Sequence, residues 1–400
     1  MLHAVQFSTL LAVEKAAAYG LHGKVRCRVL HKNGDLGIQP FSIMGRLSQK
    51  RSTLAPPSNA EVAELLALAA EEAKMPLEKA LRRASRKALM WPEEASLLFA
   101  ERGDLTELPG VGPHLARLIA GWIQNPPEVP PSPEIRRGFL TLTEARSQLE
   151  KNANFASAVK GDLQMHTQWS DGSGSVEEMA RAAAERGYEY IAITDHSKGL
   201  KIAGGIDEQQ LREQAEEINA VNASMRAEAL GVEVLHSLEL NLNPRGDGDM
   251  DPRSLSDLDF VLGCFHSALR KKEDQTERYL LALRNPDIHI LGHPRGRIYN
   301  FRLGLTADWE RVFGLAAGLD KAVEIDGYPD RQDLNVHLLK LAKKAGCRIS
   351  LGTDSHDPLQ LRFMEYSLAA ASLAGIRGDR ILNFMSAREL RQWVATLREA

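Results

Sequence analysis

Histidines and carboxylates recur at the ends of apolar runs in the second half of this sequence. Imidazole and carboxylate groups together bind Zn, Mn or Fe, and so many at one place suggest more than one ion. A single histidine at a strand end more often meets a backbone carbonyl than a metal, but eight such placements by accident are far less expected. The eight residues are His166, Asp171, His196, Glu239, His266, His293, Asp354 and His356.

The apolar runs alternate with helical patterns from about residue 160 to the C-terminus. About seven strand–helix repeats predict an α/β fold with a mostly parallel sheet, which can close into a barrel. Catalytic groups of such barrels gather at the carboxyl ends of the strands. His236, His289 and His337 lie inside predicted elements and are interpreted as structural. The predicted strands lie in runs 162–166, 190–196, 232–242, 260–266, 288–293, 323–325 and 348–352.

In this order the segments resemble the successive motifs of the polymerase and histidinol phosphatase (PHP) family. The resemblance covers residues 160 to about 360 and implies a distorted seven-stranded barrel with two or three divalent metal ions (Zn, Mn or Fe). It also implies three ligand sets. They are His166, Glu239 and Asp354 for one ion, Glu239, His266 and His293 for the second, and Asp171, His196 and His356 for the third.

One position departs from the family pattern. The first motif of the family usually begins with histidine, any residue, histidine, and here the first of these positions is Gln164. An amide oxygen can bind a metal ion, but it is a neutral and poorer ligand for a transition metal than imidazole. A weaker first metal site is therefore expected.

The predicted chemistry is hydrolysis by metal-activated water. Clustered ions lower the pKa of a bound water and orient it for attack on phosphorus, with Asp171 and His196 at the catalytic centre. Arg295 and Arg297 follow His293 closely and are predicted to clamp phosphate oxygens. Solvation at the surface is the alternative for these two arginines.

Residues 56–125 are rich in alanine and leucine at helical spacing, which predicts a small all-α domain. Its segment 108–119 places two glycines in a tight turn that opens a helix, and it resembles a helix-hairpin-helix motif, which binds the DNA backbone without reading sequence. A plain helical hairpin is the alternative. The predicted DNA-binding residues are Gly110, Gly112, His114 and Arg117.

The same stretch is similar to the lyase-type domain of bacterial family X DNA polymerases. Lyase-active relatives carry lysines where this chain has His114 and Leu118, so lyase activity is not expected. A proline-rich linker is predicted over 126–158 and the PHP phosphoesterase domain over 159–400. The gap between the two domains is too short for polymerase domains of ordinary size, and no polymerase activity is expected.

The amino-acid composition of the whole sequence is that of a globular protein. The 400 residues are 44% hydrophobic and 26% charged, with a formal net charge of -3, so nucleic-acid affinity would need a local basic patch. Residues 1–55 are locally basic. This segment is interpreted either as a nucleic-acid-binding arm or as a solvated extension. Three scattered cysteines, no secretory signal and no apolar stretch of membrane length predict a cytoplasmic protein without a membrane partner.

Three functions remain open at this stage. The first is a phosphoesterase acting on DNA ends or nucleotides, of nuclease or 3'-phosphatase type and of use in DNA repair, with exonuclease activity as one form. The second is a phosphatase of small phosphomonoesters resembling histidinol phosphate. The third is a non-catalytic DNA-binding scaffold, against which the retained cluster of costly charges argues.

Overall fold

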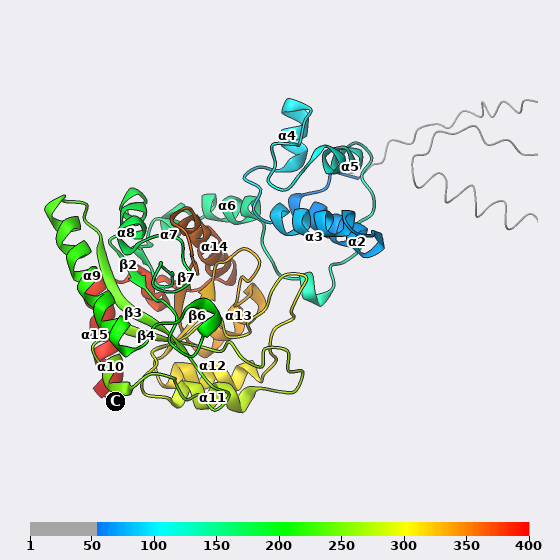
Figure 1. Cartoon of the computed structure of the whole chain (residues 1–400). Coiled ribbons are helices and arrows are strands. Elements are labelled where there is room, and N and C mark those ends of the chain that lie inside the picture. The colour runs from blue at the N-terminus through cyan, green and yellow to red at the C-terminus, as the bar shows by residue number, and fades with distance from the viewer. Residues whose placement is uncertain (1–53, 400) are drawn as a thin grey trace, which may run out of the picture. The chain divides into compact units, whose positions relative to one another are not determined.

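The computed structural model describes residues 54–399 (Figure 1). Seven parallel strands form one sheet in the order β1 to β7, each paired with the next along the chain. This order confirms the predicted α/β barrel of seven strands. The strands are β1 (Gly161–Asp162), β2 (Tyr190–Ile193), β3 (Glu233–Asn241), β4 (Phe260–Cys264), β5 (Ile290–Leu291), β6 (Ala322–Asp326) and β7 (Arg348–Gly352).

The sheet closes between its first and last strands. The amide of Leu163 donates to the carbonyl of Leu351 at 3.4 Å, and the amide of His166 donates to the carbonyl of Ser355 at 2.7 Å. Met165 and Ser355 form a parallel bridge just beyond the two strands. The contacts bring the segments after β1 and β7 together, so residues on both can share one site.

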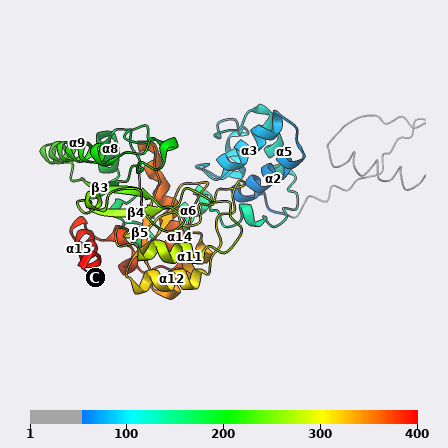
Figure 2. The same ribbon diagram turned by 60° about the horizontal axis from the view of Figure 1, so that its bottom comes forward.

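Helices cover the outside of the barrel. Neighbouring helices α8 and α9 lie side by side in two views, as do α11 and α12 (Figures 1 and 2). All four residues of β2 are buried, as expected for parallel strands covered on both faces. The helices are α8 (Val176–Glu185), α9 (Glu208–Ala227), α10 (Pro252–Leu255), α11 (Thr276–Arg284), α12 (Trp309–Gly318), α13 (Val336–Ala345), α14 (Met364–Ala374) and α15 (Ala387–Glu399).

Four helices precede the barrel and have a core of their own. Ser58 begins the first of them with a capping box that includes Glu61. Trp91 is fully buried among these helices, and its indole Nε1 donates to the carbonyl of Pro109 at 3.1 Å. The helices are α2 (Asn59–Glu72), α3 (Leu77–Ala88), α4 (Ala95–Arg102) and α5 (Pro113–Gln124).

The connection predicted as a proline-rich linker is helical in part. It contains the short 3-10 helix η1 (Glu134–Arg136) and the helices α6 (Leu142–Glu150) and α7 (Ala153–Ala156). Leu142 and Ala145 of α6 are buried in a cluster with residues of α14. The second half of this connection therefore packs as part of the barrel.

Buried polar contacts fix the four helices to the barrel. Arg136 and Glu64 of α2 form an ion pair of 2.7 Å in which each side chain is 4% exposed. Tyr299, in the loop between β5 and α12, packs into the core of the four helices, and its hydroxyl lies 3.0 Å from the Ser85 hydroxyl of α3. Helix α3 is thus held against a loop of the barrel.

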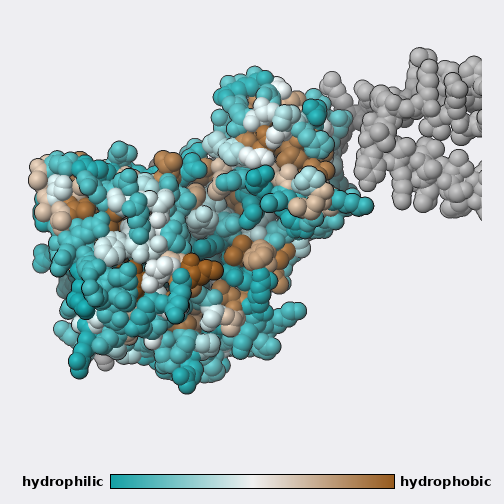
Figure 3. Space-filling model, in the orientation of Figure 1, coloured by the Kyte–Doolittle hydropathy of each residue, from teal (hydrophilic) through white to brown (hydrophobic). Residues whose placement is uncertain are grey.

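Two further expectations from the sequence concern the basic N-terminal segment and the lack of membrane-spanning helices. The basic segment predicted over 1–55 lies outside the described residues, apart from its last two positions. Within 54–399, no helix combines the length and hydrophobicity needed to cross a membrane. The face in Figure 3 is mainly hydrophilic, with smaller separate hydrophobic patches.

Arg136→Met should lower the free energy of unfolding by about 3–5 kcal/mol, because it leaves the Glu64 carboxylate buried without its partner. Urea unfolding measures the change. The exposed neighbour Arg137 provides the matched control, since Arg137→Met should change stability by no more than about 0.5 kcal/mol. Equal effects of the two substitutions would show that the buried ion pair does not stabilise the fold.

Candidate metal centre

All eight predicted histidines and carboxylates lie at the carboxyl ends of barrel strands or in the loops that follow them. Glu239 is inside β3, and a parallel bridge to His196 extends the pairing of β2 with β3. His266 and His293 follow β4 and β5, and Asp354 and His356 follow β7. Since these strand ends meet at one rim, residues far apart in the sequence become neighbours.

The Glu239 carboxylate is the common partner of the cluster, and it is fully buried. Its Oε1 lies 2.8 Å from Nε2 of His266 and 2.8 Å from Nε2 of His293. Its Oε2 lies 3.2 Å from Nε2 of His166 and 3.7 Å from Nδ1 of His196. One carboxylate therefore meets four imidazoles supplied by four different strand ends.

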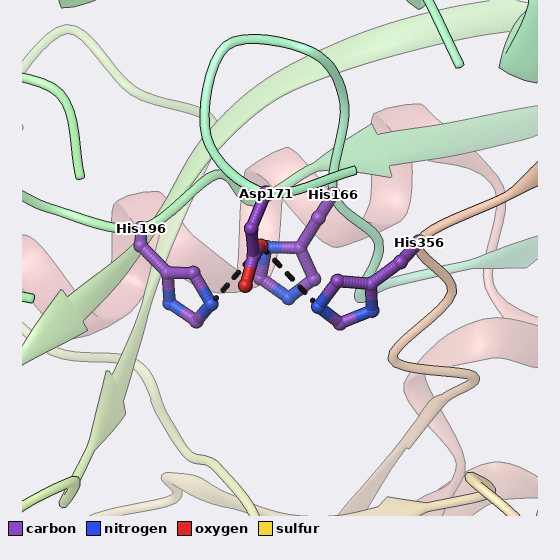
Figure 4. Close-up of side chains that lie close together, drawn as sticks. All are labelled: His166, Asp171, His196 and His356. Atoms are coloured by element: carbon purple, nitrogen blue, oxygen red, sulfur yellow. Dashed lines mark ion pairs between the residues drawn. The ribbon is translucent and has the colours of Figure 1, made fainter. Parts of the chain in front are cut away.

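Asp171 gathers the outer part of the cluster. Its Oδ1 lies 3.6 Å from Nε2 of His196 and 3.3 Å from Nε2 of His356, and Figure 4 shows these two imidazoles on either side of its carboxylate. The rings of His166 and His196 stack with centroids 4.2 Å apart. Asp171 is exposed, so this side of the cluster faces solvent.

Charge coupling sets the protonation of these groups. Burial alone would raise the pKa of Glu239, but His196 and His293 outweigh burial and hold that pKa well below its usual range. Burial opposes the charged form of His293, yet the neighbouring Glu239 raises its pKa to about 9. Burial lowers the pKa of His196 well below its usual range, against the opposing effect of Glu239.

The backbone is strained at two members of the cluster. His293 has φ of 20° and Asp354 has φ of 52°, a region that residues other than glycine rarely adopt. Strain of this kind costs about 1–3 kcal/mol and gathers at functional sites, where the surrounding structure enforces it. The two backbones are held in the conformation that aims their side chains into the cluster.

The donor groups fit divalent metal ions. Ligand atoms of His166, Glu239 and Asp354 lie within 4.8 Å of one another, and those of His166, Asp171, His196 and His356 do so too. Nδ1 of His166 and of His196 is buried without a hydrogen-bond partner. Imidazole nitrogens and carboxylate oxygens at such spacing suit Zn, Mn or Fe.

His266 and His293 of the second predicted ligand set both meet Oε1 of Glu239. Within 4.8 Å, His266 also groups with His196, and His293 also groups with Cys264. Cys264, which was not predicted to take part in the site, ends β4 two residues before His266. Burial, then the charge of Glu239, raises the pKa of its thiol well above the usual value, so the thiol holds its proton beside the carboxylate.

Gln164 lies at the base of the cluster and is fully buried. Its Nε2 donates to Oε2 of Glu239 at 3.0 Å, and its Oε1 has no hydrogen-bond partner. The amide thus occupies one of the carboxylate's acceptor positions, while its own oxygen stays available as a neutral ligand.

Beneath the histidines lie two buried carboxyl groups of β6 that sequence reasoning missed. The amide of His293 donates to Oε2 of Glu324 at 2.7 Å. Burial raises the pKa of Glu324 well above its usual range and that of Asp326 to about 7. The signal available in the sequence was their alternation with apolar residues in the run around 323–325, where both face the barrel interior.

Arg295 and Arg297, which were predicted to clamp phosphate, both contact other parts of the barrel loops. The Arg295 Nε donates to the carbonyl of Leu305 at 3.2 Å. The Arg297 guanidinium lies 3.6 Å from the centre of the Phe139 ring and is buried, which lowers its pKa to about 10. Both side chains brace loops and connections of the barrel, and a contact of either with phosphate stays a prediction.

Arg331 is the arginine that reaches the cluster, and sequence reasoning missed it. Its guanidinium contacts the Asp354 carboxylate directly and lies 3.8 Å from Oδ2 of Asp326. It belongs to the loop between β6 and α13, five residues after Asp326. Proximity to the predicted sixth strand end was the available signal.

The residues predicted to bind DNA lie on the α4–α5 hairpin. Gly110 has φ of 84°, which favours glycine, and Gly112 precedes α5 as its N-cap without a side-chain cap. His114 and Arg117 are exposed on α5. None of the four joins the histidine cluster, and neither do His236, His289 and His337, which were interpreted as structural.

A nearly closed parallel barrel with imidazoles and carboxylates at its strand ends is the class of fold and candidate metal centre that the structure shows. Residues 162–353 match the family model described as PHP domain, and the chain belongs to the PHP family. This finding confirms the resemblance seen in the sequence.

Several known proteins are similar to the chain. It is 34% identical over 237 residues to the DNA polymerase/3'-5' exonuclease PolX of Bacillus subtilis, covering 59% of this chain and 41% of that relative. It is 30% identical over 221 residues to a probable phosphatase of Thermoanaerobacter sp., covering 52% of this chain and 83% of that relative. The histidinol phosphate phosphatase of Lactococcus lactis, solved with zinc, L-histidinol and phosphate, shares 19% identity and a TM-score of 0.41, covering 55% of this chain and 94% of that one.

Gln164→His should strengthen binding of Zn or Mn, because an imidazole is a better ligand for these ions than a neutral amide. The expected change in affinity is about 10–100-fold, the size typical of substitutions around a metal site. Competition with a chromophoric chelator measures the dissociation constants. His337→Gln, on the exposed surface of α13, serves as the control and should leave them at the wild-type values. Equal affinities for wild type and Gln164→His would contradict a role of this position in the metal site.

Proposed function

We propose that this protein is a metal-dependent phosphoesterase that hydrolyses phosphate esters at DNA ends or in nucleotides. The observation that carries the proposal is the Glu239 carboxylate with four imidazoles within 3.7 Å. Among the described residues, the groups that meet in the cluster are imidazoles and carboxylates, and the one thiol that joins them, that of Cys264, is fully buried and keeps its proton. The geometry therefore favours attack by water.

Three groups of residues would hold the ions. Glu239 would bridge two of them, with His166 and Asp354 on one side and His266 and His293 on the other. Asp171, His196 and His356 would hold a third. Bound divalent ions would supply Lewis acidity and lower the pKa of a water molecule to near neutral.

The chain's own residues would orient the substrate and hold protons. Asp171 stands on the solvent side between His196 and His356, so the ester would approach over this carboxylate. Arg331 keeps Asp354 in place, and its cation would face charge that develops on phosphate oxygens. The carboxyls of Glu324 and Asp326, whose pKa values burial raises, would hold protons below the cluster.

The helical region supports DNA as the substrate. The α4–α5 hairpin ends in backbone amides at the start of α5, and helix starts of this kind bind phosphate groups. The similarity to the Bacillus subtilis relative, whose name includes a 3'-5' exonuclease, spans 237 residues. Both point to the backbone of a nucleic acid.

A small phosphomonoester is the second candidate substrate. The probable phosphatase of Thermoanaerobacter sp. is matched over 83% of its length. A small ester would be the substrate if the α2–α5 region served only to stabilise the barrel. The two candidates differ in whether the ester must carry a nucleotide chain.

End-labelled single-stranded DNA should be shortened by the purified protein in Mn or Zn, and His196→Ala and His266→Ala should lose at least about a hundredfold in rate, because each removes a ligand of the cluster. Gel electrophoresis follows the DNA, and a chromogenic phosphomonoester is assayed beside it. His337→Ala, at an exposed position, is the control and should keep the wild-type rate.

Turnover of the phosphomonoester without DNA shortening would support the second candidate. Absence of turnover on both substrates, with metal bound, would contradict the phosphoesterase proposal.

Arg117→Ala should weaken binding of single-stranded DNA equally for different sequences and reduce the salt dependence by about one unit of slope, because the side chain would contact a phosphate. Fluorescence anisotropy at several salt concentrations measures both. Arg102→Ala on α4, whose guanidinium pairs with Glu107 at 2.6 Å, is the control. A slope equal to that of the wild type would exclude Arg117 from the DNA contact.

A further inference from the structure

A pocket of about 510 Å³ opens beside the cluster, with His356 in its wall. The α3 helix contributes Arg86, the loop between β5 and α12 contributes Phe301, and the loop between β6 and α13 contributes Tyr328 and Arg331. Pockets that bind small organic ligands measure about 300–1,000 Å³. The space therefore exceeds what a phosphate group alone would fill.

Two aromatic rings give the pocket a stacking surface. Phe301 is 56% exposed, which is unusual for a ring of this size, and the Arg270 guanidinium lies 4.7 Å from its centre. The Tyr328 ring lies 6.4 Å from the imidazole of His356. One aromatic ring thus stands next to the cluster, and a second is open to solvent.

Arg86 supplies a cation that is free to bind an anion. Its side chain is 51% exposed, and its contact with Asp330 is 3.9 Å long. Arg331, in contrast, is engaged with Asp354. Asp330 offsets part of the positive charge, so the pocket suits a ligand with both an apolar ring and an anionic group.

The position of Arg86 is fixed although it belongs to the helical region. The adjacent Ser85 lies 3.0 Å from the Tyr299 hydroxyl, and the Tyr299 amide donates to the carbonyl of Asp330 at 2.7 Å. These contacts join α3 to both barrel loops that line the pocket. The pocket is consequently complete only when the helical region is present.

We propose that this pocket binds the nucleoside next to the phosphate under attack, and that the helical region completes it. The base would stack on Phe301 and Tyr328, and Arg86 would pair with the next phosphate of the strand. This inference rests on the proposed function and names its substrate as a nucleotide chain. A second role for the helices follows: they form part of the substrate pocket as well as presenting the hairpin.

The test compares three substrates, of which the two p-nitrophenyl esters share a leaving group. Thymidine 5'-(p-nitrophenyl) phosphate carries a nucleoside, methyl p-nitrophenyl phosphate does not, and a short oligothymidylate adds further phosphates. Phe301→Ala should lower the ratio of kcat/KM for the nucleoside ester to that for the methyl ester about tenfold, a loss typical of a stacked base. Arg86→Ala should lower the ratio for the oligothymidylate to that for the nucleoside ester by about fivefold or more.

Arg82→Ala is the matched control, because Arg82 lies on the same helix and pairs with Glu78 at 2.9 Å; both ratios should stay at their wild-type values. Thermal unfolding checks that each variant is folded. Hydrolysis of the methyl ester with ratios unmoved by Phe301→Ala and Arg86→Ala would overturn the pocket assignment and leave the proposed function standing. Failure of the wild type on all three substrates would overturn the proposed function and the pocket with it.

Discussion

The arrangement of the candidate metal centre depends on one carboxylate, that of Glu239, which is fully removed from water. An ionised carboxylate in a protein interior is costly unless charged or hydrogen-bonding partners surround it. Glu239 has such partners in the four imidazoles and in the Gln164 amide. Because each imidazole comes from a different strand end, the closed barrel is what allows one buried charge to be compensated from all sides.

The same requirement explains features that are separate in the sequence. The closure between the segments after β1 and β7 brings His166 next to Asp354. The positive φ values at His293 and Asp354 aim side chains inward at positions where an ordinary backbone would not. The helical region adds a wall to the pocket beside His356, so the solvent side of the cluster is shaped by two parts of the chain.

The strand ends and the polar side chains that gather there were predictable, because a buried parallel strand is a short apolar run and a polar residue at its end is conspicuous. The run 232–242 corresponds to β3 (Glu233–Asn241). The run 162–166 is regular strand only at Gly161–Asp162, since the chain beyond it turns to place His166. Element boundaries near the site were therefore less predictable than the elements themselves.

The arginines and the inner carboxyls were beyond the sequence for a physical reason. Arg295 and Arg297 follow a ligand closely, but the direction of a side chain in a long loop depends on tertiary contacts such as the Phe139 ring. Arg331 reaches the cluster from another loop, which chain order alone does not reveal. Glu324 lies inside the predicted run 323–325 and Asp326 directly follows it. Their alternation with apolar residues places them on one face of the strand, but it does not say whether that face meets the barrel interior or the covering helices.

A crystal structure of the protein soaked in Mn, with anomalous diffraction data, tests most directly whether Glu239 organises a metal centre. We expect anomalous peaks on both sides of the Glu239 carboxylate, within bonding distance of the surrounding histidines. Peaks confined to surface carboxylates, with the cluster held together by hydrogen bonds alone, would contradict it.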